Sequence, residues 1–417
     1  MGDRATAPRP APASRAERRS VTRHLRVVGA APSTPAQRAQ VARRDLRLLW
    51  ASAAGLTANG LVMVLSAGSV SATQGYDGNA FWYFQRQVLY AIAGLAAAAV
   101  VSRLRPTRWK AISVPMLGIA ALGMLIAAHP TSGTAIYGAS RWIDLGPLTI
   151  QPSEFAKLGL VAFTATILAA RFDRLDEPRQ LLLPLGPVVA VVALLGVAQS
   201  DLGTTVILVG SVLILLFVAG VRLRYLAVAT TIGAVGAAAL IVGEAYRRTR
   251  FFDAWLDPWS DPQNGGYQLI QGLIAFGSGG WFGTGLGTSR AKWDFLPNAH
   301  SDFIFAVIGE ELGLLGALVV VAAFGVFILA GVRIAVHATT TFERLLAAGI
   351  TGWIGLQTII NLGAVTGVLP ITGVPLPLVS FGGTALVVTL VGVGALAGIA
   401  RRQARPGRTG SAARARA

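Results

Sequence analysis

The sequence predicts an all-α polytopic membrane protein with ten transmembrane helices. Of the 417 residues, 53% are hydrophobic and only 13% are charged, and the mean hydropathy is +0.60. Soluble domains carry about 25% charged residues. Ten apolar runs are long enough to cross about 30 Å of hydrocarbon. They lie near residues 47–69, 87–104, 111–129, 155–170, 181–199, 203–221, 223–243, 303–334, 346–369 and 379–400.

The distribution of arginine sets the expected orientation. Residues 1–49 hold eleven Arg against three acidic residues, and residues 401–417 add six Arg. By the positive-inside rule both tails belong in the cytoplasm, which an even number of spans allows. Four short loops that carry Arg fall on the same side: 102–110, 171–179, 221–224 and 332–344. We therefore expect a multi-pass plasma-membrane protein with both termini in the cytoplasm.

Both ends of the chain are expected to be basic cytoplasmic tails. Residues 1–44 are predicted to be disordered, because Ala, Pro, Arg and Ser dominate them, and residues 401–417 form a second tail. Arg runs beside a membrane span attract anionic lipid more often than nucleic acid, so we expect anionic lipid and no nucleic acid as their partner. The absence of Cys excludes disulfides and cysteine metal sites.

The transmembrane domain, residues 45–400, is expected to build a site on its outer side. Four outer segments carry nearly all the candidate chemistry: 130–157, 199–203, the large loop 244–302 between the seventh and eighth spans, and 369–384. A loop as long as 244–302 is usually functional or disordered. The aromatic, weakly charged composition of residues 257–315 argues against disorder.

Two of these segments place charged residues at the ends of spans. Pro152 favours the start of a helix, and Glu154 suits its N-terminal dipole and pairs with Lys157 one turn later. A capped helix with one ion pair is the plain alternative for Glu154. Lys157 lies inside the first turn of a span, where an ionisable group marks a site by default. Asp201 is equally compatible with a helix cap and with a functional role.

Asp302 is the strongest candidate, because it lies at the outer mouth of the eighth span. Glu310 and Glu311 follow two turns deeper, and at least one must face the bundle interior. The preceding loop supplies Arg290, Lys292, Trp293, Asp294, Asn298 and His300. A carboxylate beside basic and aromatic groups at a bilayer surface suits a general base acting on an anionic amphiphile. A helix cap is the alternative for Asp302, and a single His is more often structural.

The glycine-rich run 277–287 does not indicate nucleotide binding. It lacks the Gly-Lys-Ser/Thr ending of a P-loop and does not follow a soluble strand. A bond made on the outer side, where ATP is scarce, must draw its driving force from an activated substrate. The scattered Asp and Glu show no His/Cys ligand spacing, so no metal site is predicted from the residues.

Five segments resemble the signature motifs of the SEDS family, the FtsW/RodA/SpoVE proteins of shape, elongation, division and sporulation. They are GASRWIDLGPLTIQPSEFAKL, SDLGTT, DPWSDPQNGGYQLIQGLIAFGSGGWFGTGLG, LPNAHSDFIFAVIGEELGLLG and LPITGVPLPLVSFGG. The likeness runs in order through all ten spans and is closer to the division branch than to RodA. It implies a glycosyltransferase that polymerises lipid II on the outer face of the plasma membrane, releases undecaprenyl diphosphate and serves septal wall synthesis.

The resemblance also implies roles for residues. The essential Asp of the family's Ala-His-(Thr/Ser)-Asp-Phe motif falls on Asp302, which we take as catalytic. The family's other motif positions and the basic loop together give the substrate-binding candidates Arg141, Trp142, Glu154, Lys157, Asp201, Arg290, Lys292 and His300. Two positions depart from the pattern: Ser200 replaces the usual Pro, and Phe381 replaces a common Tyr and so lacks its hydroxyl.

The expected partner is a class B penicillin-binding protein, a single-span transpeptidase, alongside other division membrane proteins. We also consider a divalent cation, Mg²⁺ or Mn²⁺, as a cofactor that would offset the charge of the departing diphosphate. The rival functions are a lipid II flippase lined by Lys157, Glu310 and Glu311, a RodA-type elongation polymerase, and a scaffold that only recruits partners. A flippase needs access from both faces, and the concentration of polar residues on the outer side favours the enzyme.

Overall fold

The computed structural model describes residues 34–129, 134–136, 139–146, 149–243, 248 and 251–405. Within these residues ten helices are long and apolar enough to cross a membrane. They are α2 (Pro35–Gly75), α3 (Trp82–Val101), α4 (Pro106–Ala128), α5 (Pro152–Ala170), α6 (Pro178–Ala198), α7 (Leu202–Ala219), α8 (Leu223–Val242), α11 (Ile304–Val336), α12 (Thr341–Val365) and α13 (Gly383–Gln403). The expected ten-helix, mainly α-helical class is confirmed.

The first helix begins earlier than the sequence analysis placed it. The Thr34 hydroxyl accepts a hydrogen bond from the Gln37 main-chain N–H, the Gln37 side chain accepts one from the Thr34 N–H, and Pro35 occupies the first helical position. This capping box, with Pro35, satisfies the helix start locally. Residues 35–44, expected to belong to a disordered tail, are therefore helical. Residues 1–33 and 406–417 of the two expected tails lie outside the described residues.

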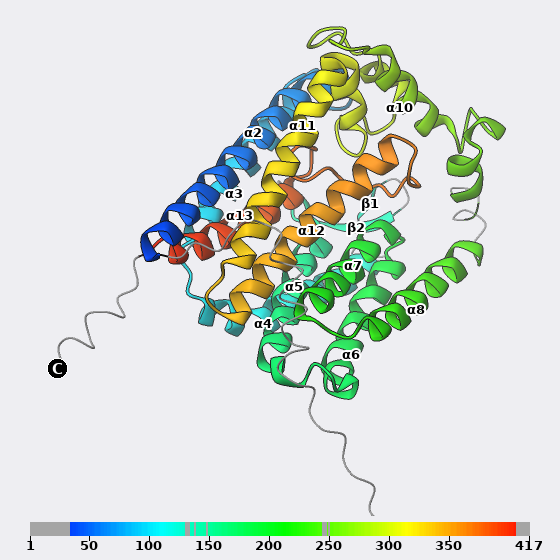
Figure 1. Ribbon diagram of the computed structural model, residues 1–417. Coiled ribbons are helices and arrows are strands. Elements are labelled where there is room, and N and C mark those ends of the chain that lie inside the picture. The colour runs from blue at the N-terminus through cyan, green and yellow to red at the C-terminus, as the bar shows by residue number, and fades with distance from the viewer. Residues whose placement is uncertain are drawn as a thin grey trace, which may run out of the picture.

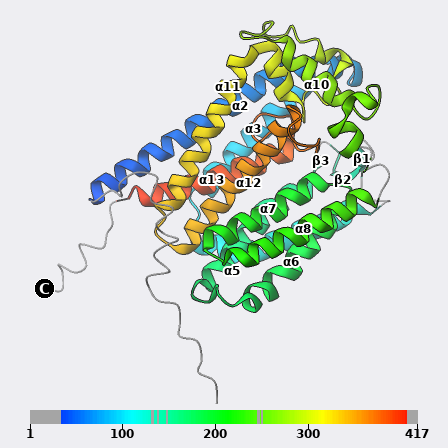
Figure 2. The ribbon, with the colours of Figure 1, turned by 45° about the vertical axis from the view of Figure 1, so that its right-hand side comes forward.

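The helices are buried to very different degrees. In the apolar span of α13, 89% of the residues are buried, and in the spans of α5 and α12 the share is 72%. These three helices therefore form the centre of the bundle. The span of α8 is only 6% buried, and this helix lies at the edge in Figure 1. Figures 1 and 2 place the start of α2 and the end of α13 together at one end of the molecule, with the strands at the other.

The connections at the strand end contain short elements. Between α4 and α5, β1 (Thr134–Ile136), β2 (Ala139–Asp144) and β3 (Thr149–Ile150) form an antiparallel sheet in that order. The large loop between α8 and α11 holds η3 (Phe252–Leu256), η4 (Pro258–Ser260), α10 (Tyr267–Ser278) and η5 (Ala291–Phe295), and η2 (Phe172–Arg174) lies between α5 and α6. The small sheet is an addition to the expected all-α fold.

Candidate active site

The four segments expected on the outer side meet at one end of the bundle. Residues 369–384, which we call the hub segment, contact the other three. The Thr384 hydroxyl accepts a hydrogen bond from the Gln151 N–H at 3.2 Å, and the Phe381 N–H donates to the His300 carbonyl at 3.0 Å. Gly203 packs so closely on the hub segment that a Cβ there would lie 2.7 Å from the Thr372 carbonyl oxygen. The hub segment therefore organises this end of the protein.

Asp302 lies where the large loop enters α11. The residue is partly exposed, whereas Phe303 and Ile304 directly after it are 1% and 0% exposed. Its main-chain carbonyl accepts a hydrogen bond from Asn361 Nδ2 on α12 at 2.8 Å. Asp302 is thus placed at the boundary between the loop surface and the buried helix, which is where a carboxyl group would meet a substrate anchored in the bilayer.

Lys157 and Glu154 are held inside the bundle, each 1% exposed. The Lys157 ammonium lies 2.8 Å from a Glu154 carboxylate oxygen and donates to Gln357 Oε1 of α12, also at 2.8 Å. It also lies 5.5 Å above the Trp353 ring. The structure pairs the two residues as the i,i+3 spacing indicates, and the pair joins α5 to α12. In this arrangement the ammonium is fully engaged by protein groups.

Replacing Lys157 alone by Met is expected to destabilise the protein by about 3–5 kcal/mol, because it strands the buried Glu154 carboxylate. Replacing both, as Lys157→Met with Glu154→Leu, should recover most of that loss, since no charge is then left unpaired. Thermal unfolding in detergent measures both variants. Equal destabilisation of the single and double variants would contradict the pairing. Restored stability with the expected lipid II polymerisation still lost would assign the Glu154–Lys157 pair a role beyond stability.

Arg141 and Asp201 lie together although 60 residues separate them. Arg141 of β2 donates from Nη2 to the Ser200 carbonyl at 2.5 Å, and its Nη1 lies 3.7 Å from Asp201 Oδ1. Asp201 also caps α7 by accepting from the Thr204 N–H at 3.1 Å. Asp201 Oδ2 and Arg141 Nε are buried without a hydrogen-bond partner.

Ser200 has a φ of +56°, which a Pro cannot adopt, so its departure from the family pattern changes the turn itself. Trp142, next in β2, is partly exposed.

The basic residues of the large loop lie on a segment that is hydrogen-bonded to α11. Arg290 is exposed, and Lys292 is partly exposed and donates to the Gly287 carbonyl. The segment that carries them is bound by Glu310 and Glu311 of α11, which are 3% and 1% exposed. Both glutamates face the bundle interior, which confirms the expectation for at least one of them.

His300 belongs to an aromatic cluster. Its ring stacks on Tyr83 of α3 with centroids 4.2 Å apart, and it meets the Phe381 ring edge-on at 5.8 Å. Removal from water disfavours the charged form and lowers the pKa of His300 to about 4. Removal of the ring from water therefore favours the uncharged imidazole at neutral pH. Phe381, where the family often has Tyr, contributes ring packing.

The lowered pKa of His300 predicts acid sensitivity. The unfolded chain takes up a proton near pH 6.5, whereas the folded protein does so only near pH 4, so stability is fully present above pH 6.5 and falls as the pH drops toward 4. The loss from pH 7 to 5 should be at most about 2 kcal/mol. A His300→Phe variant keeps the ring stacking and should show a smaller drop in melting temperature between these pH values. An identical drop in both proteins would contradict the assignment.

Four polar residues of this region were not selected from the sequence: Gln87, Gln357, Asn361 and Ser380. All are at most 4% exposed, and all bind main-chain or side-chain groups of the site. Gln357 and Asn361 stand four residues apart and are the two side-chain amides of α12. An intramembrane amide pair at helical spacing is a signal that sequence analysis can use.

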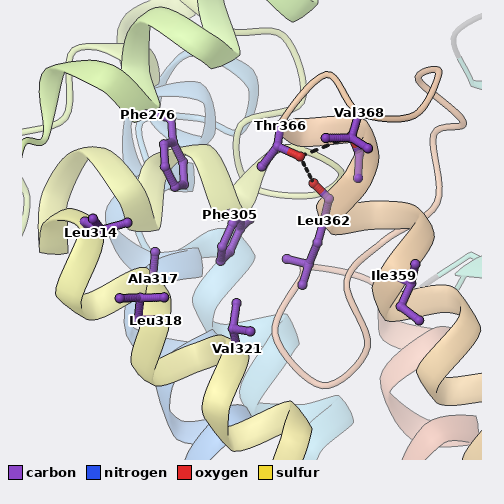
Figure 3. Close-up of a pocket in the computed structure, with 11 residues that line it drawn as sticks. Phe276, Phe305, Leu314, Ala317, Leu318, Val321, Ile359, Leu362, Thr366 and Val368 are labelled. Carbon is purple, nitrogen blue, oxygen red and sulfur yellow. Dashed lines mark hydrogen bonds between the residues drawn. The ribbon is translucent and has the colours of Figure 1, made fainter.

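A separate apolar groove opens between α10, α11 and α12, as Figure 3 shows. Its volume is about 420 Å³, and Phe276, Phe305, Leu318 and Ile359 are among its walls. Its one hydroxyl, that of Thr366, already donates to the Leu362 carbonyl at 2.8 Å. The groove offers little hydrogen bonding to sugar hydroxyls and suits hydrocarbon, so it is distinct from a saccharide site.

Comparison with known proteins decides the family. The model of the FtsW/RodA/SpoVE cell cycle proteins matches residues 46–405. The chain belongs to this family. It is 40% identical over 363 residues to the probable peptidoglycan glycosyltransferase FtsW of Geobacter metallireducens, covering 87% of this chain and 96% of that protein. The resemblance inferred from the five motifs is thereby confirmed.

Solved structures of this family share the fold. One is a chain from work on the structural coordination of polymerization and crosslinking by a peptidoglycan synthase complex. It has a TM-score of 0.70 and 30% identity, and the match covers 85% of this chain and 97% of that one. Another is the rod shape determining protein RodA of Thermus thermophilus, with a TM-score of 0.62 and 28% identity over 85% of this chain and 96% of that one. The ten-helix architecture is therefore that of the family.

Proposed function

We propose that this protein is a peptidoglycan glycosyltransferase that polymerises lipid II on the outer face of the plasma membrane. The observation that carries the proposal is the position of Asp302, a partly exposed acidic residue at the loop-to-helix boundary where four polar segments meet. The relatives named as peptidoglycan glycosyltransferases support it. Lipid II suits this position, because its lipid stays in the bilayer while its sugars reach the loops.

Asp302 acts as the general base. Its carboxylate takes the proton of the GlcNAc 4-hydroxyl of incoming lipid II, and the oxygen attacks the MurNAc anomeric carbon of the growing strand. The bond between that carbon and the diphosphate oxygen breaks, and undecaprenyl diphosphate leaves with the bonding electrons. The configuration at the anomeric carbon inverts. The diphosphate ester supplies the driving force, so no nucleotide is required.

Charge that develops on the leaving diphosphate needs cationic partners. Arg290 and Lys292 fit this role best, because both are accessible and stand on the loop that leads to Asp302. Arg141 is a second candidate, because its Nε is buried without a hydrogen-bond partner and its Nη groups hold the turn at Ser200. Lys157 would first have to leave Glu154 and Gln357. Trp142, Glu154, Asp201 and His300 are the other candidates for substrate binding.

A divalent cation, Mg²⁺ or Mn²⁺, is proposed as an aid to the departing diphosphate. No three His, Asp or Glu side chains come together in the part of the chain that the structure describes. Such an ion would be shared between the diphosphate oxygens of the substrate and one or two protein carboxylates.

Division is the cellular role that the comparisons favour. The similarity to FtsW is 40% identity, against 28% to the solved RodA. We place the protein at the division septum with both termini in the cytoplasm, and an elongation role is the alternative. A class B penicillin-binding protein, a single-span transpeptidase, is the proposed partner, because a relative of known structure acts in a peptidoglycan synthase complex. Other division membrane proteins, and anionic lipid at the basic tails, are further proposed partners.

The opposite end of the bundle favours an enzyme over a flippase. There Arg333 pairs with Asp45 at 2.9 Å, and Arg402 pairs with Glu343 at 2.7 Å. These ion pairs join α11 to α2 and α13 to α12. These four charged side chains thus tie helices together, whereas a translocator needs a polar route that opens to this side.

Purified protein supplied with lipid II, with and without the transpeptidase, tests the proposal. Long glycan strands on a gel are the expected product. Transfer of labelled lipid II across liposome membranes with no polymer formed would support the flippase instead. A scaffold would make no polymer, and deletion of its tails would matter more than substitution of its outer polar residues.

A further inference from the structure

Three successive main-chain carbonyls lead up to the proposed base, and each one is held by a donor from elsewhere in the chain. The His300 carbonyl accepts from the Phe381 N–H at 3.0 Å. The Ser301 carbonyl accepts from Ser380 Oγ at 2.7 Å, and the Asp302 carbonyl from Asn361 Nδ2 at 2.8 Å. A peptide unit is planar, so fixing three in a row fixes the direction in which the Asp302 side chain leaves the backbone.

The hydroxyl donor is itself held in place. Ser380 Oγ accepts from the Leu376 N–H at 2.8 Å, so the hydroxyl is oriented to donate to Ser301. The Ser380 carbonyl accepts from Gln87 Nε2 of α3 at 2.9 Å, and Gln87 Oε1 accepts from the Gly382 N–H at 3.4 Å. Gln87 therefore spans the hub segment on both sides of Phe381 and keeps Ser380 in position.

The amide donor is anchored in the same way. Asn361 Nδ2 donates both to Asp302 and to the Val374 carbonyl of the hub segment at 2.8 Å. One turn earlier on α12, Gln357 donates to the Pro375 carbonyl at 2.9 Å. The outer end of α12 thus holds the hub segment and the start of α11 at a fixed separation.

These groups are too deeply buried to contact a sugar. Gln87 is 1%, Asn361 is 2% and Ser380 is 4% exposed. An amide buried in an apolar helix carries a desolvation cost that a Leu would avoid. For Asn361 that cost is offset in part by the two hydrogen bonds that Nδ2 donates to the main chain, while Oδ1 is buried without a hydrogen-bond partner. An effect of these residues on chemistry must therefore pass through the backbone that carries Asp302.

We propose that Asn361 and Ser380, with Gln87 behind Ser380, are positioning residues that aim the Asp302 carboxylate at the acceptor hydroxyl. The inference rests on the proposed function. A general base must lie within hydrogen-bond reach of the proton it takes, and a misplacement of about 1 Å costs on the order of 100-fold in rate. Binding of lipid II does not depend on this aim, so the effect falls on kcat.

The test measures kcat and KM for lipid II polymerisation by Ser380→Ala, Ser380→Thr and Asn361→Leu. Ser380→Ala and Asn361→Leu should each lower kcat about 10- to 100-fold with KM changed less than about twofold. Ser380→Thr keeps the donor and should recover most of the rate. The matched control is Thr358→Val, which removes a buried α12 hydroxyl that donates only to its own helix, at the Ile354 carbonyl. Its kcat should stay within about twofold of the parent protein.

Several results would overturn the inference: a parental kcat in folded Ser380→Ala and Asn361→Leu, a loss confined to KM, or an equal loss in Thr358→Val. If Asn361→Leu does not fold, Ser380→Ala decides. If neither variant folds, the groups serve folding and the inference fails. The parent protein and Asp302→Asn separate the two levels. A parent protein that forms no polymer removes the proposed function, and full activity in Asp302→Asn removes Asp302 as the base. An inactive Asp302→Asn beside a parental rate in both positioning variants removes only this inference.

Discussion

Replacing Asp302 by Asn is expected to lower the rate of glycan polymerisation by about 10²- to 10⁴-fold, the usual contribution of a general base. Asn has nearly the same shape but cannot take a proton from the acceptor hydroxyl. The contact with Asn361 uses the main-chain carbonyl of Asp302 and survives the change, and thermal unfolding checks that the variant is folded. Asp302→Ala should be equally inactive. The measurement is the initial rate of polymer formation from purified lipid II.

A matched carboxylate elsewhere in the large loop provides the control. Asp257 is exposed and makes no capping hydrogen bond through its side chain at the start of η4. Asp257→Asn should therefore polymerise at the parental rate. Full activity of folded Asp302→Asn would remove Asp302 from the catalytic role. An equal loss in both variants would indicate that the loop responds to charge in general and that Asp302 is not specific.

The helices could be predicted because the pattern that marks each one, a long apolar run, is local in the sequence. Length and apolar content define each span without reference to any other span, and the eighth was expected at 303–334 and is found at Ile304–Val336. The start of the first helix was missed, because a capping box at Thr34 outweighed a composition typical of disorder. The small sheet was missed because its strands are only two to six residues long and depend on pairing with each other.

The site was only partly predictable. Asp302 and the pairing of Glu154 with Lys157 follow from position on a span and from helical spacing. Contacts between distant segments do not, and Gln357 shows why: its partner Lys157 lies 200 residues away. The hub segment was predicted as one of four polar outer segments, and its likeness to a family motif was recognised. Its role depends on hydrogen bonds to His300 and Ser301, which only a three-dimensional arrangement can reveal.

Two adjacent buried carboxylates, Glu310 and Glu311, hold the loop that carries the basic residues. Glu310 accepts from Ser289 Oγ at 2.5 Å, from the Arg290 N–H at 2.9 Å and from the Ala291 N–H at 3.4 Å. Three donors on three consecutive residues thus converge on one side chain. This explains how a loop with several positive-φ glycines keeps Arg290 in one place.

Glu311 binds the same loop and also connects it to α2. Its carboxylate accepts from Ser66 Oγ of α2 at 2.6 Å and from the Ser289 N–H at 3.2 Å. Two residues later α11 is interrupted at Gly313, where φ is +69° and a Cβ would lie 2.3 Å from the Gly283 nitrogen. Only glycine accommodates that close approach. The glycine-rich run therefore packs onto the break in α11, and the two glutamates fasten it there.

Glu310→Ala should accordingly release the loop and disable the enzyme. It leaves three loop donors without an acceptor, each costing about 1–3 kcal/mol, so the melting temperature should fall and the amides of 284–291 should exchange hydrogen faster. Polymerisation should be lost with them, because Arg290 and Lys292 no longer face the substrate in a fixed arrangement. Glu310→Gln keeps one acceptor oxygen and should be milder in all three measurements.

A buried glutamate at the opposite end separates this effect from general destabilisation. Glu343 is 3% exposed and pairs with Arg402, so Glu343→Ala should also lower the melting temperature. It should leave the exchange of the 284–291 amides unchanged, because Glu343 lies at the far end of the bundle from the loop. Slow exchange in Glu310→Ala, or equally fast exchange in Glu343→Ala, would show that Glu310 does not fasten the loop. The expected contrast would show that release of the 284–291 loop, and not the loss of overall stability, causes the loss of activity.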